Sequence, residues 1–263
     1  MMVKKVNVLG VGISVLNLTS AVTWVAEALA GRRKNYICVT GVHGVMEAQE
    51  NDQFRSILNR AGLCTPDGMP MVWAGRLRGH AEMGRVYGPD LMLAVCEWGE
   101  KENIRHFFLG GAPGVAGDLA FNLKKKYPKL VVAGTYTPPF RPLTTEEQMA
   151  LADLVASCRP DIIWVGLSTP KQEWFMVDNL DRLETTLMVG VGAAFDFHSG
   201  RVRQAPRWVQ RSGLEWLFRL IQEPRRLAGR YIRNNPRFVW FFMGQWLGWR
   251  KYSRLEGESG GRF

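Results

Sequence analysis

The sequence predicts an α/β fold, in which a Rossmann-like, mostly parallel sheet is flanked by helices and followed by a basic, aromatic helical appendage. Short apolar runs alternate with amphipathic stretches along most of the chain. Several of those stretches begin at a capping residue or proline and end at glycine or proline, as helices do. Arginine and tryptophan gather near the C-terminus, which predicts the appendage.

Apolar runs that are continuous, and do not alternate with polar residues, are typical of strands covered on both faces of a parallel sheet. The predicted strands span residues 6–10, 36–42, 106–111, 130–136, 161–168 and 186–195. The predicted helices between them span residues 19–33, 44–62, 88–103, 114–128 and 144–160. This alternation of strand and helix predicts a doubly wound sheet.

The charge of the chain is divided unevenly. Residues 1–200 hold 20 basic and 20 acidic side chains, whereas residues 201–263 hold 14 basic and 4 acidic ones. The whole net charge of +10 therefore lies in the second part, together with five of the ten tryptophans. We expect a body over residues 1–200 and an appendage over residues 201–263. The appendage should meet phosphate groups, on lipid or on nucleic acid.

Composition argues against several classes of protein. The four cysteines stand apart in the sequence, which predicts reduced thiols in a cytoplasmic protein. The histidines show no metal-ligand spacing with Asp or Cys, so we expect no structural zinc. No apolar run reaches the roughly 18 residues of a membrane-spanning helix. The N-terminus lacks the apolar core of a signal peptide.

Ligands of doubly wound sheets bind beyond the carboxyl ends of the strands. Several predicted strands end in runs of small and polar residues: "TGVHG", "GGAPGVA", "GTYTPPF", "GLSTPKQEW" and "GVGAAFDFHSG". These runs favour a ligand crevice, although ordinary solvated loops are the alternative. The candidate binding residues in them are Thr40, His43, Gly110, Gly111, Gly134, Tyr136, Gln172 and Asp196.

The segment "FFLGGAPGVAGDLAFNL" predicts a strand, a glycine turn and a helix, whose N-terminal N–H groups favour a phosphate. Its spacing is not GxGxxG, so a dinucleotide site is weakly supported and a nucleotide diphosphate is preferred. A turn that needs glycine only for packing is the alternative. Gln172 follows Pro170 and could pair with a uracil edge or a sugar hydroxyl. Lys171 and Glu173 could equally form an ordinary solvated helical turn.

Two carboxylates and one arginine are further candidates. The stretch "LCTPDGMPMVW" (63–73) predicts a turn around Asp67, because Pro66 restricts φ and Gly68 tolerates positive φ. The carboxylate of Asp67 either completes that turn or is held out for chemistry. Asp90, in "RVYGPDLM", is an N-cap or a ligand, and Arg85 binds phosphate or is surface charge.

The appendage has a helical pattern. Arg219, Arg226, Arg230, Arg233 and Arg237 recur at steps of 7, 4, 3 and 4, roughly on one face. The run "FVWFFMGQWLGW" is too short to span a bilayer and suits an interfacial helix on an anionic membrane. Packing on the body or in an oligomer interface is the alternative. No nucleic-acid-binding motif accompanies the charge, so we expect no nucleic-acid partner.

Six ordered motifs resemble those of the WecG/TagA/CpsF glycosyltransferases (family 26) over about residues 35 to 240. They are "PDG", "GPDL", "FLGGAPGVA", "VGLSTPKQEWF", "GVGAAFDFHSGRVRQAP" and "GLEWLFRLIQEPRR". The resemblance implies a Rossmann-like enzyme with a membrane-binding appendage. Such an enzyme moves a hexose-type sugar with inversion from a UDP-sugar to a polyprenyl-diphosphate-linked saccharide. N-acetylmannosamine, its uronic acid and glucose are the donor sugars it suggests. The setting would be surface polysaccharide synthesis at the inner face of the cell membrane.

The resemblance also assigns roles to residues of this sequence. It implies that Asp67 is the general base, that Thr40 belongs to the catalytic loop and that Arg85 and Gln172 bind substrate. An Asn is expected where Val42 stands, and His43 follows it, so His43 either replaces that amide or the acceptor binds differently. The implied ligands of the lipid diphosphate are Arg219, Arg225 and Arg226, to which we add Arg203, Arg207 and Arg230.

The residue types suit this chemistry. One base can deprotonate the acceptor hydroxyl while arginines and helix N-termini hold the charge of the leaving UDP. No clear DxD motif follows a strand, so we expect metal independence and no cofactor. A nucleotide-sugar or NAD-dependent oxidoreductase or epimerase is the alternative, because it shares the glycine turn. A non-catalytic scaffold protein is a further alternative. Whether the protein forms a homo-oligomer is left open by the sequence.

Overall fold

The computed structural model describes residues 3–253 and divides the chain into two compact units. The first unit combines Met1–Asn17, Val39–Tyr87 and Gln204–Phe263, and the second combines Leu18–Cys38 and Gly88–Arg203. The C-terminal segment therefore folds together with residues from the first third of the chain.

A six-stranded sheet has the order β4-β3-β8-β7-β5-β6. Its strands are β3 (Asn35–Thr40), β4 (Leu63–Pro66), β5 (Arg105–Gly110), β6 (Val131–Tyr136), β7 (Ile162–Gly166) and β8 (Leu187–Gly190). The pairs β3–β8, β8–β7, β7–β5 and β5–β6 are parallel. The prediction of a Rossmann-like, mostly parallel sheet is confirmed.

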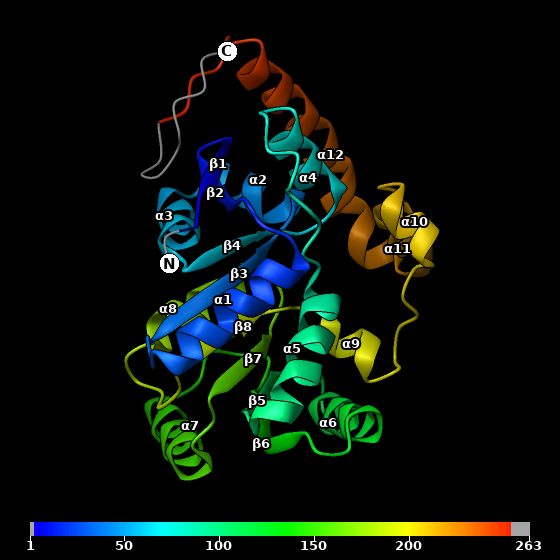
Figure 1. Cartoon of the computed structure of the whole chain (residues 1–263). Coiled ribbons are helices and arrows are strands. Elements are labelled where there is room, and N and C mark those ends of the chain that lie inside the picture. Colours follow the sequence, from blue (N-terminus) through cyan, green and yellow to red (C-terminus); the bar gives the residue numbers. More distant parts are fainter. Residues whose placement is uncertain (1–2, 254–263) are drawn as a thin grey trace. The chain divides into compact units, whose positions relative to one another are not determined.

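The helices of the second unit alternate along the chain with strands β5 to β8, and α1 precedes β3 (Figure 1). They are α1 (Leu18–Ala30), α5 (Gly88–Glu102), α6 (Val115–Lys126), α7 (Thr145–Cys158), α8 (Lys171–Asn179) and α9 (Ala194–His198). Helix α1 packs on α5, and α9 packs on both α5 and α6. Helix α7 begins with a capping box, in which the side chains of Thr144 and Glu147 each accept the other residue's backbone N–H.

The first unit contains a hairpin and helices. Strands β1 (Lys5–Val8) and β2 (Val11–Ser14) pair antiparallel. The helices are α2 (Val42–Glu50), α3 (Asp52–Arg60), α4 (Met69–Arg76), α10 (Arg207–Arg211), α11 (Glu215–Gln222) and α12 (Pro224–Trp246). Helix α12 packs on α2 and on α11, as Figure 1 shows.

Three local predictions were wrong. Residues 6–10 do not form a parallel strand, because the chain reverses at Leu9 and Gly10, both at positive φ, into the β1–β2 hairpin. The predicted helix 44–62 breaks at Asn51, whose side chain accepts the N–H of Phe54 and starts α3. Strand β4 was not predicted, since only four residues precede the turn at Asp67.

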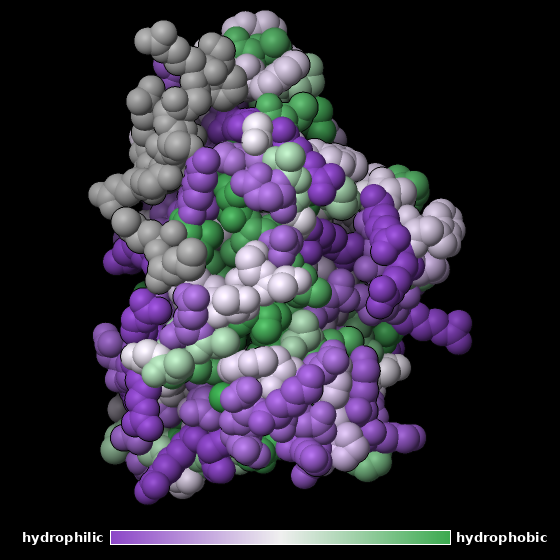
Figure 2. Space-filling model, in the orientation of Figure 1, coloured by the Kyte–Doolittle hydropathy of each residue, from purple (hydrophilic) through white to green (hydrophobic). Residues whose placement is uncertain are grey.

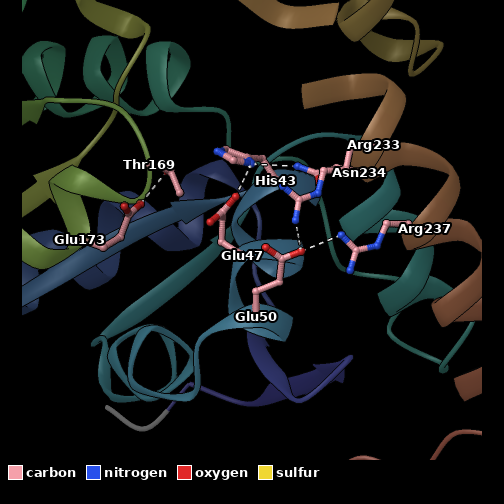
Figure 3. A network of polar contacts seen from close by, with 8 residues as sticks. All are labelled: His43, Glu47, Glu50, Thr169, Glu173, Arg233, Asn234 and Arg237. Carbon is pink, nitrogen blue, oxygen red and sulfur yellow. Dashed lines mark hydrogen bonds and ion pairs between the residues drawn. The ribbon is translucent and has the colours of Figure 1, made fainter. Parts of the chain in front are cut away.

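Helix α12 is held on α2 by charge as well as by packing. Leu227, Asn234 and Phe238 are buried. At the surface, Glu50 of α2 accepts hydrogen bonds from both Arg233 and Arg237, each at 2.7 Å (Figure 3). These two bonds lower the pKa of Glu50, the one from Arg237 most. Arg233 and Arg237 therefore serve, at least in part, to anchor the helix.

Candidate active site

The turn that carries Asp67 joins two strand ends of the first unit. Strand β4 ends at Pro66, Gly68 takes a φ of +87°, and α4 begins at Met69. The N–H of Asp67 donates to the carbonyl oxygen of Thr40, the last residue of β3, at 3.0 Å. The turn predicted from Pro66 and Gly68 is thus present, and it leaves the Asp67 side chain half-buried.

Thr40 is almost completely buried, and its hydroxyl accepts from the Cys64 thiol at 3.2 Å. Next to it, Gly41 leaves room for Asp67. A Cβ on Gly41 would lie 2.9 Å from the Asp67 carbonyl oxygen and 3.6 Å from its Oδ2. The backbone of Thr40 and Gly41 therefore lies against the turn. The Thr40 carbonyl oxygen accepts the Asp67 N–H, and Gly41 leaves space for the Asp67 carbonyl oxygen.

A second extended segment places Tyr87 near Asp67. The N–H of Val86 donates to the carbonyl oxygen of Pro66 at 3.0 Å, and the Thr65 hydroxyl donates to the Val86 carbonyl oxygen at 3.4 Å. Tyr87 is only 6% exposed. Burial raises its pKa well above the ordinary value, and the charges of Glu215 and Asp67 raise it further. The two segments are therefore joined next to Asp67, and the charge of Asp67 acts on the buried Tyr87 phenol.

Arg85 forms an internal ion pair. Its Nη2 lies 2.8 Å from Oε2 of Glu215 in α11, and the two side chains are 12% and 14% exposed. The guanidinium carbon of Arg85 also lies 4.0 Å from the centroid of the Tyr87 ring. Arg85, predicted to bind phosphate, thus contacts a carboxylate and an aromatic ring of its own chain.

Positive charge gathers where α11 and α12 meet. Burial alone would lower the pKa of Arg219, but the groups of Tyr231, Tyr87, Glu223 and Glu215 raise it. Burial lowers the pKa of Arg230, and the neighbouring charge of Arg226 lowers it further.

Tyr231 interacts electrostatically with Arg219 and Arg230 and also with Asp67. Burial raises its pKa, and the carboxylate of Asp67 contributes to that rise. Its ring packs edge-on against Trp216 at 5.9 Å. The C-terminal helices therefore bring arginine and tyrosine side chains into the surroundings of Asp67.

His43 lies in the first turn of α2 and faces α12. Its Nδ1 is 3.1 Å from the side-chain nitrogen of Asn234 and 3.5 Å from Oε1 of Glu47 (Figure 3). An amide from α12 thus meets His43 one residue beyond Val42, where the resembled family has an asparagine.

In the second unit, the candidate residues gather at the carboxyl ends of β5, β7 and β8. Gly110 and Gly111 end β5 with φ values of +134° and +74°, and the Gly111 N–H donates to the Gly166 carbonyl oxygen at 3.0 Å. A Cβ on Gly110 would lie 2.5 Å from that oxygen, so no other residue fits there. Gly134 lies inside β6 against the Phe107 ring, so its place indicates packing. Tyr136 ends β6 half-buried.

Gln172 and Glu173 begin α8, and both are buried, whereas Lys171 is exposed. The Thr169 hydroxyl donates to Glu173 Oε1 at 2.8 Å, and Gln172 Nε2 donates to the same oxygen at 3.1 Å. Burial raises the pKa of Glu173 in spite of these bonds. The solvated turn that the sequence left open is therefore wrong for Glu173 and correct for Lys171.

The remaining candidates lie as follows. Asp90 is in the first turn of α5, which begins at Gly88, so the expected N-cap role is wrong. Asp196 is in α9, where its carbonyl oxygen accepts from three donors: the N–H groups of Arg201 and Val202 and the Ser199 hydroxyl. Among the arginines proposed for the lipid diphosphate, Arg203 in the second unit and Arg207, Arg225 and Arg226 in the first are exposed. Arg226 is hydrogen-bonded to Glu223.

Sequence reasoning missed Tyr87, Glu215 and Tyr231. Tyr87 stands two residues after Arg85 and Glu215 stands inside "GLEWLFRLIQEPRR", so both were within the quoted motifs. Neither has a local pattern that predicts a contact with the other, because the contact depends on how α11 packs.

Two further features of the described residues concern membranes and metals. No helix within residues 3–253 is both long and apolar enough to cross a membrane. Within the same residues, no three His, Cys, Asp or Glu side chains are grouped as metal ligands.

Comparison with known proteins agrees with the motifs. The model of the family described as "Glycosyl transferase WecG/TagA/CpsF family" matches residues 6–252. The chain is 30% identical over 223 residues to an N-acetylglucosaminyldiphosphoundecaprenol N-acetyl-beta-D-mannosaminyltransferase of Bacillus spizizenii, and the match covers 84% of each chain. The chain is thus a glycosyltransferase and not an oxidoreductase or epimerase: it belongs to the WecG/TagA/CpsF family.

Proposed function

We propose that this enzyme transfers a hexose-type sugar, with inversion, from a UDP-sugar to a polyprenyl-diphosphate-linked saccharide during surface polysaccharide synthesis. The relative from Bacillus spizizenii is named for transfer of N-acetylmannosamine to an undecaprenyl-diphosphate-linked N-acetylglucosamine. N-acetylmannosamine is therefore the first donor sugar to test, before its uronic acid and glucose.

The observation that carries the mechanism is the setting of Asp67. Its carboxylate is half-buried on a turn whose N–H donates to Thr40, and its charge contributes to raising the pKa of the buried phenols of Tyr87 and Tyr231. On this proposal Asp67 takes the proton of the acceptor hydroxyl as that oxygen attacks the anomeric carbon of the donor. The bond from the anomeric carbon to the UDP oxygen breaks on the opposite face, so the configuration inverts.

The arginines of α11 and α12 suit the diphosphate of the acceptor lipid. Arg219 and Arg230 are partly buried. Burial lowers the pKa of Arg230, and repulsion by the neighbouring Arg226 lowers it further. A diphosphate would relieve that repulsion by supplying the missing negative charge. Arg225 and Arg226 lie exposed at the start of α12, where they can meet phosphate oxygens. Arg203 and Arg207 are the outer candidates.

For the donor, we propose the strand ends of the second unit. The glycine turn at Gly110 and Gly111 leads into α6, whose N-terminus favours a phosphate. Gln172 and the strand-end residues Tyr136 and Asp196 are candidates for the uridine and the sugar, and Asp90 remains one as well. On this proposal arginines and backbone N–H groups hold the leaving UDP, with no metal or cofactor.

We further propose that the enzyme acts as a peripheral protein at the inner face of the membrane. Ile232, Val239, Met243 and Trp246 recur at steps of 7, 4 and 3 on α12, and all four are exposed. Trp240, Met243 and Trp249 line an open pocket at the end of that helix. Figure 2 shows hydrophobic side chains at the surface where the C-terminal half of α12 lies in Figure 1. An exposed apolar stripe beside arginines suits an anionic lipid surface.

The experiment is a panel of UDP-sugars with a short-chain polyprenyl-diphosphate N-acetylglucosamine acceptor. We expect transfer from one donor of the panel, an inverted anomeric centre by NMR, and a fall in kcat of at least about 100-fold in Asp67→Asn. Circular dichroism should confirm that the variant is folded. Full activity of Asp67→Asn would refute the assigned base, and a retained configuration would refute inversion.

A further inference from the structure

Helix α11 brings a carboxylate to the site that no proposed step uses. Glu215 is the first residue of that helix, and its Oε2 lies 2.8 Å from Arg85 Nη2. Both side chains are largely withdrawn from water. A buried charge whose partner moves away is left without solvation, which is costly. The pair therefore holds Arg85 and the start of α11 in one relative position.

Tyr87 is part of the same arrangement. Its ring lies under the Arg85 guanidinium at 4.0 Å. Burial raises the pKa of its hydroxyl, and the charge of Glu215 raises it further. Glu215 thus pairs with Arg85 directly, and through Arg85 it is linked to the Tyr87 ring. A change at this carboxylate alters the position of the buried phenol, which packs too tightly to adjust alone.

The 85–87 segment is in turn fixed to the turn of Asp67. The backbone bond from Val86 to Pro66 and the side-chain bond from Thr65 to Val86 join the two segments at the residue before Asp67. A continuous set of contacts therefore runs from Glu215 through Arg85 and Tyr87 to Asp67. All of its members lie in the first unit.

We propose that Glu215 is a positioning residue for the transfer reaction, and that it acts by holding Arg85, and through Arg85 the Tyr87 ring, against the turn that carries Asp67. Docking of α11 then completes the catalytic geometry, beyond supplying arginines to the lipid diphosphate. The inference rests on the proposed role of Asp67 as the base. On this proposal Glu215 acts through Arg85 and not on the reacting atoms.

The competing explanation is that Glu215 only tethers the C-terminal helices. A matched control exists in Glu50, which tethers α12 to α2 through Arg233 and Arg237. Glu50→Gln removes the same charge and also breaks arginine–glutamate pairs that hold a C-terminal helix, although these pairs are more exposed than that of Glu215. No contact of Glu50 reaches the 85–87 segment among the described residues. We expect the full-length Glu50→Gln protein to keep kcat within about twofold of wild type.

The test compares wild type with Glu215→Gln, Tyr87→Phe and the double variant, using UDP-sugar and a short-chain acceptor. We expect each single variant to lower kcat by about 10- to 100-fold, with KM for the UDP-sugar within about twofold, because a misplaced base slows only the chemical step. The double variant should be no slower than the slower single variant, since the charge of Glu215 acts on the Tyr87 hydroxyl and both substitutions remove that coupling.

Each other result overturns the inference. Three results would show that Glu215 only tethers the C-terminal helices. They are a wild-type kcat in Glu215→Gln, an equal loss of kcat in Glu50→Gln, and losses of kcat that multiply in the double variant. If Glu215→Gln does not fold, Tyr87→Phe decides alone by the kcat and KM criterion, because it removes a single oxygen. A wild-type protein without any transfer activity would overturn the proposed function and, with it, this inference. An active wild type with an unaffected Glu215→Gln would overturn the inference alone.

Discussion

The backbone N–H of Asp67 donates to the carbonyl oxygen of Thr40 at 3.0 Å, and this bond ties the candidate base to the end of β3. The space around the bond is narrow. Gly41 has a φ of −109°, which any residue can adopt, yet a Cβ there would come 2.9 Å from the Asp67 carbonyl oxygen. The glycine is therefore required for close approach and not for backbone freedom.

We accordingly expect Gly41→Ala to move the Asp67 turn. The overlap with a backbone oxygen should cost about 1–3 kcal/mol of unfolding free energy and lower kcat about 10-fold or more. Urea unfolding and initial rates measure the two effects. Gly117→Ala is the control, because its Cβ would meet no atom within 4 Å and α6 should gain slightly in stability. Equal behaviour of the two variants would contradict the prediction.

His43 offers a test of the position at which this chain departs from the resembled pattern. Its contacts with Asn234 and Glu47 require a side chain that can accept or donate a hydrogen bond. We expect His43→Ala to lower kcat/KM for the acceptor about 10-fold or more, and His43→Asn to keep most of it. Steady-state kinetics at saturating UDP-sugar measures both. Wild-type kinetics in His43→Ala would show that the imidazole has no part in the reaction.

The apolar stripe of α12 predicts how the protein meets lipid. Met243→Glu places a charge on the exposed stripe and should weaken binding to vesicles of anionic lipid about 10-fold or more, since a methionine side chain contributes about 1.5 kcal/mol when it leaves water. Vesicle flotation at fixed salt measures the binding. Met149→Glu on α7 is the matched control, because it makes the same substitution at an exposed methionine outside the arginine-rich helices. An equal loss in both variants would exclude α12 as the contact.

His106 predicts how stability depends on pH. It is fully buried in β5 and its Nδ1 accepts from Trp164 Nε1 at 3.0 Å. Burial lowers its pKa to about 4, so the unfolded chain binds a proton at a higher pH than the folded one. The associated stability is present above about pH 6.5 and is lost as the pH falls toward 4, by about 3 kcal/mol.

His106→Asn keeps an acceptor for Trp164 but cannot titrate in that range. Between pH 7 and pH 4 the wild type should therefore lose about 3 kcal/mol more unfolding free energy than the variant does. Urea unfolding at the two pH values measures the difference. Equal losses of unfolding free energy in the two proteins would show that His106 does not contribute to the loss of stability in acid.

Local chemistry predicted much of the fold. The apolar runs gave the parallel strands, and Pro66, Asp67 and Gly68 predicted the turn that the structure contains. Short elements were the weak point. Strand β4 has four residues and no alternation of its own, and the hairpin at residues 5–14 depends on Leu9 adopting positive φ, which no pattern predicts. Both are stabilised by pairing with neighbours and not by local preference.

The candidate site could be predicted only in part. Thr40 was expected at a strand end and Asp67 in a turn, but neither pattern predicted the hydrogen bond that joins them. Arg85 was expected to bind phosphate, yet it pairs with Glu215, which was not a candidate. Glu173 was expected to be solvated or functional, and it is buried with Thr169 as a partner. The partner of a charged side chain is decided by packing, which leaves no periodic trace in sequence.

By itself, the sequence determined the order of strands and helices, the turn at Asp67 and the basic C-terminal segment, together with the motifs that mark the family. These features rest on residues that are close in the chain, so local conformational preference and periodicity record them. Only the tertiary structure decided that α12 packs on α2 and that Glu215 meets Arg85. Those contacts join residues far apart in the chain, and they form only when whole helices bury their apolar faces together.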